Sequence, residues 1–153
     1  MLKQLYLIPI VIIFLACGDG PKSIDTSEDA CSYCYGAIKN PVYASQVQTL
    51  SGEFRLFDSI ECMVAFLNKS PKIKMMWVVD YNHPKNWIEA TNASYLQSDS
   101  LHSPRGVNMV AFKTPAEAAD AYKKLGGMVM NWQDAKKIAT IKYLQNKKTE
   151  EIY

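Results

Sequence analysis

Three cysteines of the chain have the chemistry to bind one soft metal ion. Cys31 and Cys34 form a Cys-x-x-Cys pair, and Cys62 lies in the first turn of a predicted helix, where the helix dipole lowers the pKa of a thiol. Met63 follows Cys62 and adds a thioether to this region. Thiolates and thioethers are soft ligands, which select Cu(I) or zinc over hard cations. These four residues are therefore candidate metal ligands.

A single Cys-x-x-Cys pair is compatible with several kinds of site. Haem attachment needs a histidine directly after the second cysteine, and the chain has Tyr35 there. A thioredoxin-type pair begins a helix, whereas this pair precedes a predicted hairpin. A closed structural zinc site needs four ligands, and there is no second pair. A Cys31–Cys34 disulfide and a soft-metal site both remain open.

Met63 has a second interpretation. It is adjacent to Cys62 on the predicted helix, so the two side chains cannot share a face. Met63 belongs to the apolar stripe of that helix, with Ile60 and Val64, and methionine is a common filler of hydrophobic cores. Cys62 is therefore the better ligand candidate of the two.

The first residues predict export from the cytoplasm. Lys3 is followed by an apolar run over residues 5–15, which is too short to span a bilayer because a spanning helix needs about 20 residues. We expect residues 1–16 to be a lipoprotein signal peptide. An ordinary secretory signal or an uncleaved anchor is the alternative.

The sequence after this run predicts a lipid anchor. Leu15-Ala16-Cys17-Gly18 resembles a bacterial lipobox, with Phe14 where leucine is more common. Cleavage before Cys17 would leave a cysteine that carries lipid, and two or more acyl chains hold a protein to a membrane stably. Residues 17–30 are mostly polar and are predicted to form a flexible tether.

The first half of the remaining chain predicts two strands, a helix and a strand. Residues 41–57 alternate as a hairpin does, with a turn at Ser51-Gly52. Asp58 is the predicted helix cap, with Glu61 completing a capping box. An apolar strand is expected over residues 72–81.

The second half repeats this order. Strands are expected over residues 94–97 and 107–112, and Thr114-Pro115-Ala116-Glu117 has the cap, the proline and the glutamate of a helix start. Gly126-Gly127 ends that helix, and residues 128–132 form the closing strand. The predicted fold class is thus α+β, with two ββαβ units forming one compact domain over residues 31–132. Residues 133–153 are expected to be a C-terminal helix and tail.

Several motifs along the chain occur in one order that is typical of a known family. They are Cys31-x-x-Cys34, Phe57-Asp58-Ser59-Ile60-Glu61-Cys62-Met63, Trp87-Ile88-Glu89-Ala90-Thr91, Ser103-Pro104-Arg105-Gly106 with Ala111-Phe112, and Gly126-Gly127. In this respect the chain resembles the NosL family of nitrous-oxide reductase accessory lipoproteins. The resemblance implies two homologous ββαβ units, a lipid anchor on Cys17, and Cu(I) carried to the apo reductase outside the cytoplasm.

The chain departs from the family pattern at two candidate ligands. Gly36 and Arg105 stand where the family usually has methionine. Met109, in the strand after Gly106, is a candidate replacement ligand, and His102 is a candidate nitrogen ligand. The resemblance therefore leaves two readings: a Cu(I) chaperone that uses Cys31, Cys34 and Cys62, or a family member without copper that acts as a disulfide-bonded scaffold.

Composition and motifs exclude other classes of protein. The formal net charge of +2 provides no strong basic field, so nucleic-acid binding is not expected. No phosphate-binding loop, nucleophile motif or metal-binding His-Glu helix is present, so we do not expect an enzyme. We expect a protein of the bacterial cell envelope that faces the periplasm. Its expected partners are the membrane and a copper-receiving enzyme such as nitrous-oxide reductase, with its assembly factors.

Overall fold

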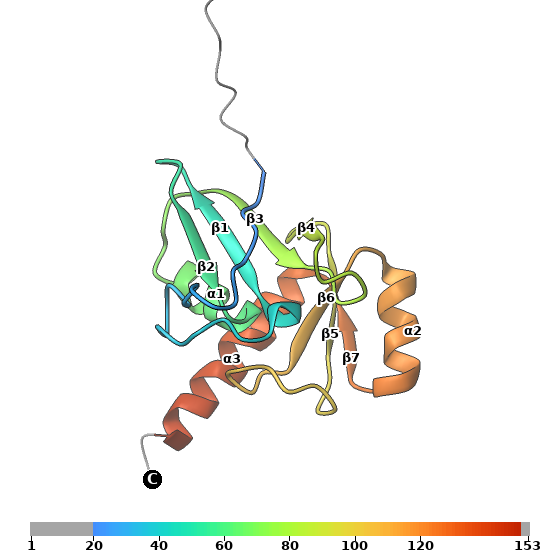
Figure 1. Cartoon of the computed structure of the whole chain (residues 1–153). Coiled ribbons are helices and arrows are strands. Elements are labelled where there is room, and N and C mark those ends of the chain that lie inside the picture. Colours follow the sequence, from blue (N-terminus) through green and yellow to red (C-terminus); the bar gives the residue numbers. More distant parts are fainter. Residues whose placement is uncertain (1–19, 151–153) are drawn as a thin grey trace, which may run out of the picture.

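The structure is a computed structural model that describes residues 20–150 (Figure 1). The predicted signal peptide over residues 1–16 and the predicted lipid site at Cys17 lie outside this range. Among the helices of the described range, none has both the length and the apolar character needed to cross a membrane.

The first ββαβ unit forms an antiparallel sheet with the strand order β2-β1-β3-β4. Its elements are β1 (Ser45–Thr49), β2 (Phe54–Phe57), α1 (Ile60–Leu67), β3 (Ile73–Val79) and the added edge strand β4 (Trp87–Glu89), with a short 3₁₀ turn at Pro41–Tyr43 before β1. The predicted hairpin is confirmed, because β1 pairs with β2 from Ser45 opposite Phe57 onward. The sequence analysis missed β4, which has only three residues.

The second unit repeats the arrangement in a three-stranded sheet with the order β6-β5-β7. Its elements are β5 (Ser94–Gln97), β6 (Met109–Phe112), α2 (Pro115–Leu125) and β7 (Met128–Met130). In both units the first strand lies between the other two strands of its unit. The capping box of α2 is present, with Thr114 and Glu117 bonded to each other's backbone amides.

The predicted closing strand ends earlier than expected. Trp132 begins the C-terminal helix α3 (Trp132–Glu150) instead of ending a strand. The reason is Asn131, whose side-chain oxygen accepts a hydrogen bond from the Asp134 amide at 3.1 Å. Asparagine is a strong helix cap, and it starts the helix here.

The two units share one core. Asp80, at the end of β3, forms a parallel bridge with Ala111 of β6, which joins the two sheets. The main apolar cluster includes Val47 of the first unit and Tyr95 of the second. Helix α3 runs from the end of β7 toward α1 (Figure 1). There the side-chain amide of Asn68 donates to the Thr140 hydroxyl at 3.2 Å. The prediction of one α+β domain is confirmed.

The expected tether is shorter than predicted. The Lys22 backbone amide donates to Oε1 of Gln46 at 3.0 Å. Nε2 of Gln46 donates in turn to the Lys22 carbonyl at 2.9 Å. The Lys22 ammonium lies 5.1 Å from the centre of the Phe54 ring, and Ile24 packs on a small apolar cluster beside β1. Residues 22–30 therefore belong to the folded domain, because backbone and cation–π contacts hold a segment whose composition alone predicts disorder.

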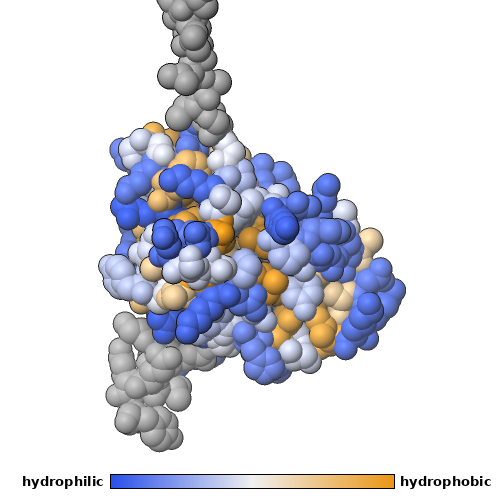
Figure 2. Space-filling view, in the orientation of Figure 1, coloured by the Kyte–Doolittle hydropathy of each residue, from blue (hydrophilic) through white to orange (hydrophobic). Residues whose placement is uncertain are grey.

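The surface divides into hydrophilic and apolar regions. Figure 2 shows hydrophilic side chains over the outer side of α2, at the right of the view, and apolar patches between α2 and the first sheet. This pattern matches the helix itself, in which Ala118 is buried while the residues around it are mostly exposed. The domain thus presents a largely polar exterior on this face.

Candidate metal centre

The first turn of α1 places one of the cysteines. Ser59, and not Asp58 as predicted, is the helix cap, because its hydroxyl accepts the Cys62 amide at 3.3 Å. Cys62 therefore occupies the third helical position, and its side chain is fully buried. The correction matters because Asp58 no longer serves the helix and is available to other groups.

A tight loop before β1 places the other two cysteines. Ala30 and Ala37 form an antiparallel bridge across its base. The Cys31 amide donates to the Gly36 carbonyl at 2.8 Å, and the Tyr35 amide donates to the Cys31 carbonyl at 2.9 Å. Tyr35 takes a left-handed conformation with φ of 63°. These contacts fold Cys31 and Cys34 back on each other, beside the start of α1.

Four side chains from these two segments meet in one cluster. The Sγ atoms of Cys31, Cys34 and Cys62 and a carboxylate oxygen of Asp58 all lie within 4.8 Å of one another. Because a metal–sulfur bond is about 2.3 Å, two sulfurs on one ion are at most about 4.6 Å apart, so the cluster is close to the size of a metal site. The three thiols are free, not joined in a disulfide.

Asp58 is the member of this cluster that sequence reasoning did not name as a candidate ligand. Its Oδ2 accepts a hydrogen bond from the Cys34 thiol at 3.3 Å, and its Oδ1 accepts one from the Ser59 hydroxyl at 3.2 Å. The signal was present in the sequence, since Asp58 stands directly before the helix that carries Cys62. Reading it as a cap concealed its role, because a capping carboxylate would point into the helix.

The thiols of the cluster differ in their acidity. Interaction with the Cys62 thiol lowers the pKa of Cys31 to about 6. The same interaction, together with burial, raises the pKa of Cys62. Burial raises the pKa of Cys34. The interaction between the two buried thiols thus favours the thiolate on Cys31 over the thiolate on Cys62, and the thiolate is the form of cysteine that binds metals.

A basic side chain also reaches the cluster. The Arg105 guanidinium interacts with the Cys34 sulfur, which raises the pKa of Arg105 and opposes in part the burial that raises the pKa of Cys34. The sequence analysis noted this residue only because it replaces a methionine. Arg105 is therefore a charged neighbour of the cysteine cluster.

Gly36 is another neighbour of the cluster. A Cβ atom at this residue would lie 3.5 Å from the Cys34 sulfur and 3.9 Å from Oδ2 of Asp58. Both are ordinary van der Waals contacts, and Gly36 does not have a positive φ. A side chain at residue 36 would therefore start beside the cluster.

The two methionine candidates lie in the protein interior. Met63 and Met109 are fully buried and belong to the same apolar cluster as Cys31 and Cys62. Their role as ligands stays a prediction. His102 donates its backbone amide to the Tyr43 hydroxyl at 3.1 Å and is not part of the cysteine cluster.

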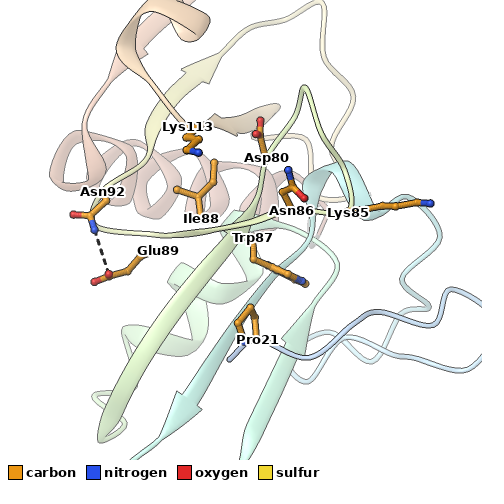
Figure 3. A pocket seen from close by; sticks show the side chains of 9 residues that line it. All are labelled: Pro21, Asp80, Lys85, Asn86, Trp87, Ile88, Glu89, Asn92 and Lys113. Carbon is orange, nitrogen blue, oxygen red and sulfur yellow. Dashed lines mark hydrogen bonds between the residues drawn. The ribbon is translucent and has the colours of Figure 1, made fainter. Parts of the chain in front are cut away.

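A surface hollow of about 610 Å³ is separate from this cluster. It lies beside β4, and its lining includes Asp80, Trp87, Glu89 and Lys113 (Figure 3). None of its lining residues is a cysteine or a methionine, and none belongs to the cluster. The cysteine cluster and this hollow are therefore separate features of the described chain.

The donor set of the cluster fits a soft metal ion. Three sulfur atoms and one carboxylate oxygen converge, and thiolates bind Cu(I) and zinc well. Cys31 and Cys62 are buried, while Cys34 is partly exposed and flanked by exposed Tyr35 and Gly36. An ion held here would thus be reachable from one side.

Comparison with known proteins agrees with the fold. The sequence model of the NosL family matches residues 21–139. A search among curated proteins finds no match. The structure is similar to the crystal structure of the copper chaperone NosL from Shewanella denitrificans, with a TM-score of 0.65 and 17% sequence identity over 76% of this chain and 95% of that chain. At 17% identity, the structural similarity shows a shared fold. The match to the family model shows the family, because it covers most of the sequence. The chain belongs to the NosL family.

Proposed function

We propose that this protein is a copper chaperone of the bacterial cell envelope that binds Cu(I) through Cys31, Cys34 and Cys62. One observation carries the proposal: three sulfurs from two separate segments converge within 4.8 Å in a domain of the NosL family. The similar Shewanella denitrificans protein is named a copper chaperone. The Cu(I) ion is the cargo of such a protein, so its role is binding and transfer.

Transfer would proceed by exchange of ligands. When Cu(I) binds, the thiols of Cys34 and Cys62 lose their protons, since thiolates are the metal-binding form. The partly exposed Cys34 is the sulfur that a receiving protein could reach first, whereas Cys31 and Cys62 are buried. A ligand of the partner would then replace Cys34 before the two buried sulfurs release the ion.

The N-terminal sequence is the basis for the proposed cellular location. Residues 1–16 are proposed as a lipoprotein signal peptide, and Cys17 as the lipid-bearing residue that tethers the domain to a membrane facing the periplasm. The tether would be short, because the domain begins near Lys22. The proposed receiver is a copper enzyme such as nitrous-oxide reductase, with its assembly factors.

An anaerobic Cu(I) titration against a chromophoric chelator tests this function. The full-length chain, reduced and in mild detergent, is compared with a Cys31→Ser/Cys34→Ser double variant. We expect one Cu(I) per chain in the wild type and a loss of competition in the double variant. A wild-type chain that fails to compete with the chelator would contradict the proposal and favour a family member that works without copper.

A further inference from the structure

The turn that carries Arg105 is held firmly against the cluster. Within the turn, the Asn108 amide donates to the Ser103 hydroxyl oxygen at 2.8 Å, and the Ser103 amide donates to Oδ1 of Asn108 at 3.0 Å. The Gly106 amide closes the turn on the Ser103 carbonyl at 3.0 Å. Asn108 adopts a left-handed conformation with φ of 62°. This network fixes the backbone on both sides of Arg105.

The same turn is attached to the helix of the cluster. The Ser103 hydroxyl donates to the carboxyl group of Glu61, which is fully buried and precedes Cys62 in α1. A hydrogen bond between two buried groups is costly to break. The backbone at Arg105 is thus held close to the helix that carries Cys62, and its guanidinium interacts with the Cys34 sulfur.

The ligands alone do not explain how a monovalent ion would be selected. Three thiolates and a carboxylate are also the donors of a four-coordinate zinc site. Zn(II) forms stable complexes with such donors. A site for Cu(I) built from this cluster therefore needs another feature that disfavours divalent ions.

We propose that Arg105 is a specificity-determining residue that disfavours divalent metal ions relative to Cu(I) in the cysteine cluster. The inference rests on the proposed copper-binding function. A guanidinium is permanently charged, and it repels a nearby ion in proportion to the charge of that ion. It therefore opposes Zn(II) twice as strongly as Cu(I). Its interaction with the Cys34 sulfur does not by itself distinguish the two metals, because a thiolate bound to either ion can still accept a hydrogen bond.

The charge of Arg105 can be removed or kept by substitution. Arg105→Gln keeps a polar side chain without charge and without adding a sulfur ligand, and Arg105→Lys retains the charge as a matched control. The residue is only partly buried, so both variants should fold, which circular dichroism would verify. Affinities for Cu(I) and Zn(II) are measured separately on the reduced full-length chain with chelators suited to each metal.

The ratio of the two affinities is the decisive quantity. We expect Arg105→Gln to shift this ratio toward Zn(II) by about tenfold. A repulsion of that size lies between the energies of two nearby unit charges in bulk water and near a protein surface. Arg105→Lys should stay near the wild type. Equal changes for both metals in Arg105→Gln, or a lysine variant that behaves like the glutamine variant, would overturn the role of Arg105 alone. A wild-type chain without Cu(I) affinity would instead refute the proposed function.

Discussion

Cys34 has the most varied surroundings of the three thiols. Its thiol donates a hydrogen bond to Asp58, its sulfur interacts with the Arg105 guanidinium, and Gly36 places no side chain beside it. Cys31 and Cys62 instead interact mainly with each other inside the core. The cluster therefore has two buried sulfurs that can anchor an ion and one accessible sulfur whose neighbours set how easily the ion leaves.

A thioether introduced at residue 36 should strengthen Cu(I) binding. In Gly36→Met the new side chain starts 3.5 Å from the Cys34 sulfur, and the thioether is a soft ligand. One added ligand is expected to improve Cu(I) affinity about tenfold, which corresponds to about 1.4 kcal/mol. Chelator competition under anaerobic conditions measures the change.

Gly36→Leu is the matched control for this substitution. Leucine has a similar size but no sulfur, so it tests whether shielding the cluster from water accounts for the effect. We expect Gly36→Leu to bind Cu(I) no more tightly than the wild type. Equal gains in both variants would show that residue 36 acts by covering the site and does not provide a ligand.

At the scale of elements, the cluster depends on how α1 begins. Ser59 bonds the Cys62 amide and also donates to Asp58, so one side chain positions two members of the cluster. Thr114 has the same capping role in α2, where its hydroxyl accepts the Glu117 amide at 3.2 Å. Helix α2 lies on the second sheet and contributes no residue to the cluster.

The two caps provide a matched pair of substitutions. Ser59→Ala and Thr114→Ala should each lower the free energy of unfolding by about 1 kcal/mol, as measured with urea. Only Ser59→Ala should also weaken Cu(I) binding severalfold, because it loosens the first turn that holds Cys62 and Asp58. If both variants weakened binding to the same extent, the cap would matter through general stability and not through the position of the ligands.

The elements were largely predictable from sequence, whereas the site was predictable only in part. Both ββαβ units follow from local signals such as the Thr114 capping box and the glycines after α2. The contacts of Lys22 with Gln46 and the addition of β4 depend on partners distant in sequence, which no local pattern reveals. At the site, the cysteine pattern pointed to three members of the cluster, but Asp58 was mistaken for a cap because two adjacent residues could both fill that position.

At the scale of the whole molecule, the centre joins the two units. Cys31, Cys34, Asp58 and Cys62 come from the first unit, while Arg105 comes from the second and is attached to α1 through Ser103 and Glu61. Helix α3 crosses from the second sheet to α1. An ion bound to Cys62 is therefore held by the same packing that joins the two sheets.

Metal binding should for this reason stabilise the folded chain as a whole. The unfolded chain retains the Cys31-x-x-Cys34 pair, which can still bind Cu(I), and only folding brings Cys62 and Asp58 to it. Binding to the unfolded state reduces the stabilisation expected from mass action. An ion at one hundred times its dissociation constant would contribute at most about 2.7 kcal/mol, or about 5–10 °C in Tm for a domain of this size.

Cys62→Ser separates these two contributions. The variant keeps the pair and is expected to bind Cu(I) more weakly, with nearly equal affinity in the folded and unfolded states. Anaerobic thermal unfolding, followed by circular dichroism with and without Cu(I), should show an increase in Tm for the wild type and almost none for Cys62→Ser. An equal increase in both would mean that the ion is held by the loop of residues 31–36 alone, and that the convergence of this loop with α1 does not contribute to binding.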